Sequence, residues 1–170
     1  KGELQEFDPE VYRADLQESR CREEFHRLIN EELVTYRFQP IINANDGSVF
    51  ASEALIRVDL PTLRSPTDVL RLAREENCLH EVERITFFRS AEAYRALESA
   101  GTVAPGALLF VNSIASQYLN PDELQEFSSR YASILPRIVI EITEEEGLDP
   151  KALRIKQSIP GSSGAFALDD

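Results

Sequence analysis

The stretch VTYRFQPIINANDGSVFASEALIRV, residues 34 to 58, decides the fold because it holds two strand-like runs joined by a turn. Residues 34–44 and 48–58 are rich in apolar and β-branched side chains, and the letters NDG at 45–47 lie near their junction. Asp-Gly between two such runs is a strong signal for a β-hairpin. The sequence therefore predicts a sheet that begins with two antiparallel strands.

Short apolar strands alternate with capped helices in the rest of the chain. ALLFVN (107–112), RIVIEIT (137–143) and GAFALDD (164–170) are continuous apolar runs, typical of strands buried on both faces. Helices are expected to begin near residues 65, 120 and 149, where a capping side chain precedes a proline, and another to cover about 82–97. This alternation predicts βα units, a parallel sheet and the α/β class.

An amphipathic helix is expected near the N-terminus. Apolar residues recur at helical spacing through a charged stretch, which predicts a helix from about Leu16 to Glu32. We assign residues 1–19 to a tail or linker and residues 20–170 to the folded domain.

The composition limits the class of partner. Thirty acidic and 18 basic residues give a net charge of −12, which disfavours binding to a long nucleic acid. A small anionic ligand held through divalent cations stays compatible, because bound metal ions reverse the sign of the local field. The apolar runs are far shorter than the roughly 20 residues that span a bilayer, so we expect no membrane contact from this segment.

The cysteines and histidines are expected to be structural. Cys21 and Cys78 are too few and too isolated for a disulfide framework or a cysteine-rich zinc site. A cytoplasmic location therefore fits best, with any membrane anchor placed elsewhere in the parent protein. His26 and His80 stand alone in helix-like contexts and are expected at the surface or at the edge of the core.

Polar side chains follow three of the expected strands at the point where each one ends. Asn112 follows ALLFV, Glu141 lies near the end of RIVIEI, and Asp169 and Asp170 follow GAFAL. The carboxyl ends of parallel strands meet at one face of the sheet, so these side chains should converge. Glu53, in the second strand of the hairpin, is a candidate for the same face. Such oxygen ligands suit Mg²⁺ or Mn²⁺.

Each of these residues also has a purely structural interpretation. Asn112 alone is a common turn residue, and Asp169 with Asp170 could cap a following helix. Glu141 is harder to explain in that way, because an unpaired acid inside an apolar run is costly. The metal site is therefore favoured by the coincidence across four strands.

Five motifs resemble those of the EAL domain family, the cyclic di-GMP phosphodiesterase module of bacterial signalling. EALIR (53–57) matches the motif that names the family, FQPI (38–41) resembles its YQPI strand, FVNS (110–113) its VNLS strand, IEITE (140–144) its ExTE strand, and LDD (168–170) the start of its DDFG strand. The motifs occur in family order and span nearly all of residues 20–170.

The resemblance implies a TIM-like (β/α)8 barrel whose first strand is antiparallel to the rest. Such barrels need about 250 residues, and five strands are expected here, so the barrel should be incomplete in this chain and residues 20–170 should form the N-terminal part of an EAL domain. The helix near 16–32 resembles the linker helix that follows a sensory or GGDEF-type domain. It could mediate a homodimer, or it could plug the base of the barrel.

The resemblance further implies metal-dependent hydrolysis of cyclic di-GMP to the linear dinucleotide. By position, Glu53, Asn112, Glu141 and Asp169 would be ligands of Mg²⁺ or Mn²⁺, with Asp170 at a second metal ion. The catalytic residue is not assigned, because the family's lysine would lie beyond Asp170, and the fragment alone is expected to be inactive.

The same resemblance implies that Gln39 and Arg57 bind the substrate. The chain departs from the family pattern at Phe38, where a tyrosine is usual, and at Ser113 and Ile114, where leucine and serine are usual. None of these changes removes an expected ligand. Two alternatives stay open: a receptor that binds cyclic di-GMP without cleaving it, and a degenerate scaffold that neither binds nor cleaves it.

Overall fold

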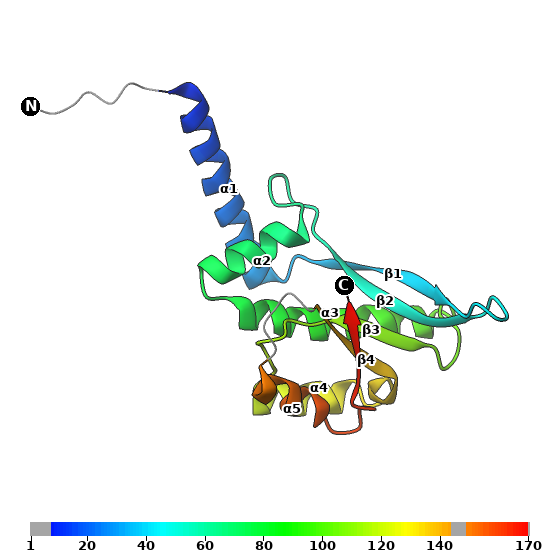
Figure 1. Ribbon diagram of the computed structural model, residues 1–170. Coiled ribbons are helices and arrows are strands. Elements are labelled where there is room, and N and C mark those ends of the chain that lie inside the picture. Colours follow the sequence, from blue (N-terminus) through cyan, green and yellow to red (C-terminus); the bar gives the residue numbers. More distant parts are fainter. Residues whose placement is uncertain (1–7, 144–148, 170) are drawn as a thin grey trace, which may run out of the picture.

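The computed structural model describes residues 8–143 and 149–169 (Figure 1). The helices are α1 (Pro9–Glu31), α2 (Pro66–Glu75), α3 (Leu79–Ser99), α4 (Pro121–Arg130) and α5 (Pro150–Gln157), with a short 3-10 helix at Leu135–Arg137. The strands are β1 (Thr35–Ile42), β2 (Val49–Arg57), β3 (Leu108–Asn112), β4 (Ile138–Thr143) and β5 (Ala165–Asp169).

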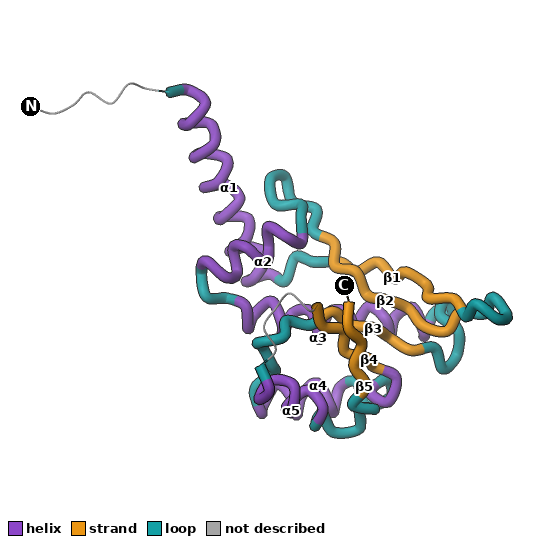
Figure 2. The backbone as a smooth tube through the Cα atoms, viewed as in Figure 1, coloured by secondary structure: helices purple, strands orange, loops and turns teal. Residues whose placement is uncertain are grey.

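The five strands form one sheet in the order β1-β2-β3-β4-β5 (Figure 2). Strand β1 pairs with β2 in antiparallel fashion, and the other neighbouring pairs are parallel. Gly47 has a φ of 72° in the turn between the first two strands, a conformation that glycine adopts without strain. The predictions of an N-terminal hairpin and of the α/β class are confirmed.

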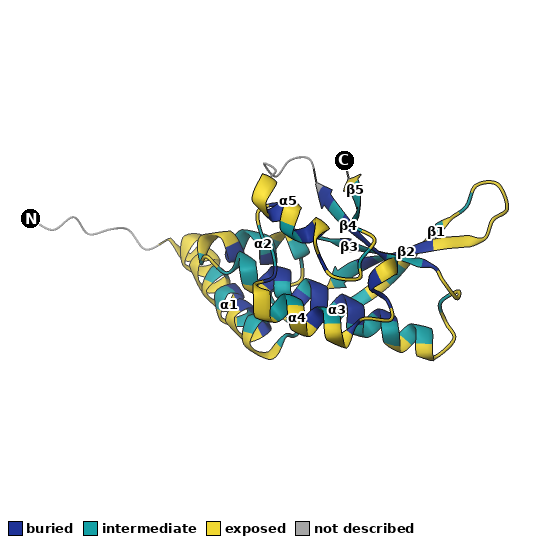
Figure 3. Ribbon diagram, turned by 90° about the horizontal axis from the view of Figure 1, so that it is seen from below, coloured by how far each residue is buried: buried dark blue, intermediate teal, exposed yellow. Residues whose placement is uncertain are grey.

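The main core lies between the sheet and the helices α3 and α4. Helix α3 contacts β1, β2 and β3, and aromatic side chains of α3 meet those at the end of α4. The rings of Phe87 and Phe88 lie edge-on to that of Phe127, at centroid distances of 5.5 and 5.3 Å. In Figure 3 buried residues gather where α3 meets the strands, while the tip of the β1–β2 hairpin is exposed.

Helix α1 begins at Pro9, so the expected start at Leu16 was wrong and residues 9–15 are helical rather than a tail. The cause is local: the Asp8 side chain accepts a hydrogen bond of 2.8 Å from the Glu10 backbone, and Pro9 occupies the first turn. The first half of α1 projects from the rest of the molecule (Figure 1). Its helical hydrogen bonding runs without a break through residues 19 and 20.

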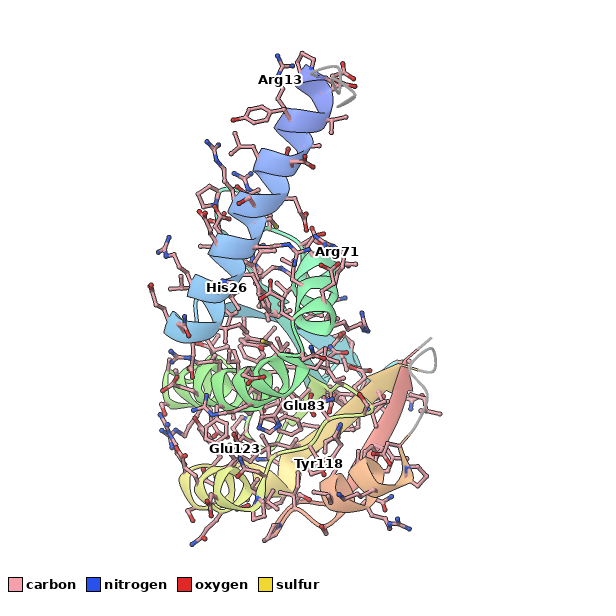
Figure 4. The ribbon with its side chains drawn as sticks, turned by 90° about the vertical axis from the view of Figure 1, so that its left-hand side faces the viewer. Arg13, His26, Arg71, Glu83, Tyr118 and Glu123 are labelled. Atoms are coloured by element: carbon pink, nitrogen blue, oxygen red, sulfur yellow. The ribbon has the colours of Figure 1, made fainter. Side chains whose placement is uncertain are left out.

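The second half of α1 is fixed to α2 by packing and by charge. Cys21, Phe25 and Leu28 are buried in a second cluster that includes residues of α2. On the surface, Arg22 and Arg71 bridge Glu18 and Glu75 across the two helices. Figure 4 shows Arg71 on α2 and His26 on α1.

His26 is exposed and His80 is partly buried, in agreement with the predicted positions at the surface or at the edge of the core. His26 pairs with Glu76, and His80 lies 3.1 Å from Glu123. Among the described residues, no helix combines the length and the apolar character needed to cross a membrane.

Glu24 on α1 holds the loop between β2 and α2 and should make the stability of the fold depend on pH. Its Oε2 accepts hydrogen bonds from the backbone of Thr62 at 2.8 Å and of Leu63 at 2.7 Å. Desolvation, the largest single influence, raises the pKa of Glu24, but the hydrogen bonds from Leu63 and Thr62 together hold it below its ordinary value of 4.5.

We therefore expect Glu24→Gln to lower the free energy of unfolding at pH 7 by about 1 kcal/mol. Because the pKa of Glu24 is lower in the folded than in the unfolded protein, the carboxylate stabilises the fold at a pH above the unfolded-state pKa. This contribution is lost as the pH falls through the pKa of the folded state. Urea unfolding of wild type and variant at pH 7 and at about pH 3 measures the difference. A difference that stays constant across this range contradicts the prediction.

Candidate functional site

The strand register brings the predicted site residues toward one end of the sheet. Gln39 of β1 lies opposite Glu53 of β2, and Asn112 of β3 lies opposite Glu141 of β4. Asp169 of β5 is paired with Thr143, two positions beyond Glu141 along β4. Asp170 lies outside the described residues.

Two of the predicted metal ligands are in contact. The Nδ2 of Asn112 donates a hydrogen bond of 3.3 Å to Oε1 of Glu53. This contact does not use Oδ1 of Asn112, which is the amide atom that binds a hard cation. Glu53, Asn112 and Glu141 are all partly buried.

The donor chemistry fits a hard divalent cation, although the described side chains do not complete a metal site. Carboxylate and amide oxygens are the ligands that Mg²⁺ and Mn²⁺ prefer. Within the described part of the chain, no three histidine, cysteine, aspartate or glutamate side chains form a group that could hold a metal ion. The metal-ligand assignment therefore stays a prediction.

A pocket of about 270 Å³ opens beside this contact. Its apolar wall comes from α2, α3 and the residues after β3, and includes Val69, Leu70, Val82 and Ile114. Polar groups at the ends of β2 and β3 complete it: Arg57, Asn112 and Ser113. The pocket therefore places one guanidinium and one predicted metal ligand next to an apolar surface.

The two predicted substrate-binding residues occupy different positions at this site. Arg57 is exposed at the end of β2 and lines the pocket, with its Nη1 donating to the Ile56 carbonyl at 2.8 Å. Gln39 is exposed on β1 beside Glu53 and does not line the pocket.

A buried acid that the sequence analysis missed lies against the wall of the same pocket. Glu83 of α3 is fully buried, and Figure 4 shows it on α3. It accepts hydrogen bonds from Ser113 Oγ at 2.6 Å and from the Ile114 backbone at 2.8 Å. Lys156 of α5 approaches to 3.1 Å and donates to the Ile114 carbonyl at 2.6 Å.

Burial sets the electrostatics of this group. Desolvation raises the pKa of Glu83, and this effect exceeds the opposing influence of Lys156 and of the other donors. The signal that could have revealed Glu83 is its helical face: Phe87, Ser90 and Tyr94 follow it at four, seven and eleven residues and are all buried. This spacing predicts that a charged residue on the same face lies in the interior.

Comparison with known proteins gives a family match and a set of similar structures. A family model described as the EAL domain matches residues 22–159. A search of curated protein sequences finds no match to this chain.

Three solved structures illustrate the similarity. The EAL domain of Xanthomonas citri FimX in complex with c-diGMP is 18% identical, with a TM-score of 0.64, over 92% of this chain and 62% of that one. The PaMucR phosphodiesterase in its c-di-GMP complex is 18% identical, with a TM-score of 0.67, over 88% and 62%. Vibrio cholerae LapD, as an S helix-GGDEF-EAL chain bound to c-di-GMP, is 17% identical, with a TM-score of 0.60, over 89% and 37%.

These likenesses concern the fold. The five-stranded sheet with its antiparallel first strand matches part of the TIM-like fold of the EAL structures, as expected from the sequence. The chain spans between 37% and 62% of the length of these three structures.

Proposed function

The chain belongs to the EAL domain family, and from that premise we propose that it forms part of a metal-dependent phosphodiesterase that opens cyclic di-GMP to the linear dinucleotide. The observation that carries the proposal is the contact between Glu53 and Asn112 beside a pocket that Arg57 also lines. In this region Arg57 can bind a phosphate group, the oxygen atoms of Glu53 and Asn112 can bind a hard cation, and the apolar wall of the pocket can contact a flat ring.

We assign the metal-binding role to Glu53, Asn112, Glu141 and Asp169, with Asp170 at a second ion. Bound Mg²⁺ or Mn²⁺ would supply an acidified water and would neutralise charge on the phosphoryl oxygens. The chain's own contribution is to hold several oxygen ligands on neighbouring strands, with Asn112 and Asp169 at the ends of β3 and β5. Hydrolysis then joins the water oxygen to phosphorus, breaks one phosphorus–oxygen bond of the ring and leaves a proton on the ribose oxygen.

We assign substrate binding to Arg57 and Gln39. The planar guanidinium of Arg57 can donate two parallel hydrogen bonds to one phosphate. Gln39, next to Glu53 on the neighbouring strand, offers both a donor and an acceptor to a base or a ribose. The apolar wall around Val69 and Leu70 suits the face of a flat heteroaromatic base.

The proposed setting is a bacterial cytoplasmic signalling protein with an attached sensory or GGDEF-type domain. The LapD structure combines an S helix, a GGDEF domain and an EAL domain in one chain. Helix α1 would be the connecting element in this protein, because its first half projects from the rest of the molecule (Figure 1).

A receptor without catalysis is the second candidate. It is favoured by one observation: the pocket with Arg57 is formed by the described residues, whereas the described side chains do not complete a metal site. In that case the protein would bind cyclic di-GMP and leave it intact.

Incubation of cyclic di-GMP with the full-length protein that contains this chain tests the proposal. With Mg²⁺ we expect the linear dinucleotide to appear on chromatography, and with EDTA in place of Mg²⁺ we expect none. Unchanged cyclic di-GMP in both samples, together with binding by calorimetry, supports the receptor. If the protein neither cleaves nor binds cyclic di-GMP, both functions are excluded.

A further inference from the structure

Glu83 and Lys156 are the only charged side chains buried in the described part of the chain. They come from α3 and α5, which are far apart in the sequence, and they meet at the segment that directly follows Asn112. A buried ion pair is not an efficient source of stability, because the cost of removing two charges from water offsets much of their attraction. Their position therefore calls for a different explanation.

The pair holds Ile114, two residues after Asn112, through its backbone N–H and its carbonyl. The Ile114 N–H donates to Oε2 of Glu83, and the Ile114 carbonyl accepts from Nζ of Lys156. The hydroxyl of Ser113 donates to the other carboxylate oxygen, Oε1 of Glu83. Both residues after Asn112 are thus held by hydrogen bonds. Ser113 bonds to Glu83 and to the Glu141 carbonyl, and the Ile114 carbonyl also accepts from the Gln117 N–H at 3.0 Å.

That backbone bond fixes the other side of the same segment. The Ser113 N–H donates to the carbonyl of Glu141 at 2.9 Å, which ties the end of β3 to β4. Asn112 is therefore held by its neighbours on β4 and by the pair from α3 and α5. The side chain of Asn112 donates the 3.3 Å hydrogen bond to Glu53.

We propose that Glu83, Lys156 and Ser113 are positioning residues that fix the orientation of Asn112 toward a divalent cation. The inference rests on the proposed function, because it assigns a role to these residues in the same site. It also gives a reason for serine at position 113: leucine could not donate to Glu83, and one of the two carboxylate oxygens would lose its shortest hydrogen bond.

Binding of Mn²⁺, followed by the electron paramagnetic resonance signal of the free ion, tests this role without depending on turnover. In the full-length protein, we expect Ser113→Ala and Glu83→Gln to weaken Mn²⁺ binding about 10-fold, in the range found for groups that orient metal ligands. The Mg²⁺ concentration that gives half-maximal turnover should rise by a similar factor.

Ser90→Ala is the matched control. Ser90 is a buried serine on the same helix as Glu83, and its hydroxyl donates within α3 to the Thr86 carbonyl at 2.6 Å. We expect this variant to bind Mn²⁺ as the wild type does, whatever its effect on stability.

Normal Mn²⁺ binding in Ser113→Ala and Glu83→Gln, with only a lowered melting temperature, would overturn the positioning role and leave the proposed function intact. If Glu83→Gln does not fold, Ser113→Ala decides the question. A wild-type protein that neither binds Mn²⁺ nor cleaves cyclic di-GMP overturns both, so the two failures are distinguishable.

Discussion

Replacing Lys156 with methionine is expected to lower the free energy of unfolding by about 3–5 kcal/mol, the range measured when one partner of a buried ion pair is removed. Lys156 is 2% exposed and Glu83 is fully buried, with 3.1 Å between Nζ and Oε1. Methionine keeps most of the volume of lysine, so the expected loss reflects the carboxylate left without its cation. Urea unfolding at pH 7 measures it.

The double variant Glu83→Gln with Lys156→Met separates charge from packing. A neutral glutamine keeps an acceptor for the Ile114 N–H and leaves no buried charge, so we expect the double variant to recover a large part of the loss. If the double variant is no more stable than Lys156→Met alone, the uncompensated carboxylate is not the cause.

On the proposed function, replacing Glu53 with glutamine in the full-length protein is expected to reduce the Mg²⁺-dependent hydrolysis of cyclic di-GMP by more than about 100-fold. Loss of a group that only orients a metal ligand has a smaller effect. Glutamine has the same shape and can still accept the hydrogen bond from Nδ2 of Asn112. It lacks the negative charge that a hard cation prefers. The initial rate of linear dinucleotide formation, measured over a range of Mg²⁺ concentrations, gives the effect.

Ser52→Ala is the control for this position. Ser52 precedes Glu53 on β2, and successive side chains of a strand point to opposite faces of a sheet. We expect Ser52→Ala to retain the rate of the wild type. Activity in Glu53→Gln equal to that of Ser52→Ala would contradict the assignment of Glu53 to the metal.

The strands and their order follow from patterns that depend on the local sequence. The Asp-Gly turn predicts the hairpin, and the apolar runs at 107–112 and 137–143 contain β3 and β4. Strand β4 is predictable because a strand buried on both faces requires apolar residues, and Ile138, Val139 and Ile140 are all buried. Strand β3 buries only alternate residues, Leu109 and Val111, although its sequence is equally apolar.

The start of α1 is predictable from the same capping pattern that begins three other helices. Ser65-Pro66, Asn120-Pro121 and Asp149-Pro150 each place a capping residue before a proline, and each begins a helix. Asp8-Pro9 is the same pair of residue types. No residue from 9 to 20 is buried, so apolar spacing alone predicts a start at Leu16.

The candidate site is less predictable, because it depends on side chains that come from distant parts of the chain. The family motifs identify Glu53, Asn112 and Glu141, but they say nothing about which residues support them. The partners Glu83 and Lys156 lie 73 positions apart, and their contact arises only when α3 and α5 fold onto the end of β3. No local pattern encodes such a meeting.

The order of the strands in the sheet has a consequence for how the protein is made. Each strand after β1 is hydrogen-bonded to the one that precedes it in the sequence, so β2 to β5 can join the sheet in the order in which they leave the ribosome. The hairpin, which needs only a short loop to close, supplies the first template. Until the next strand has been synthesised, the strand at the growing edge exposes unpaired backbone groups, and that interval is when a chaperone would be most useful.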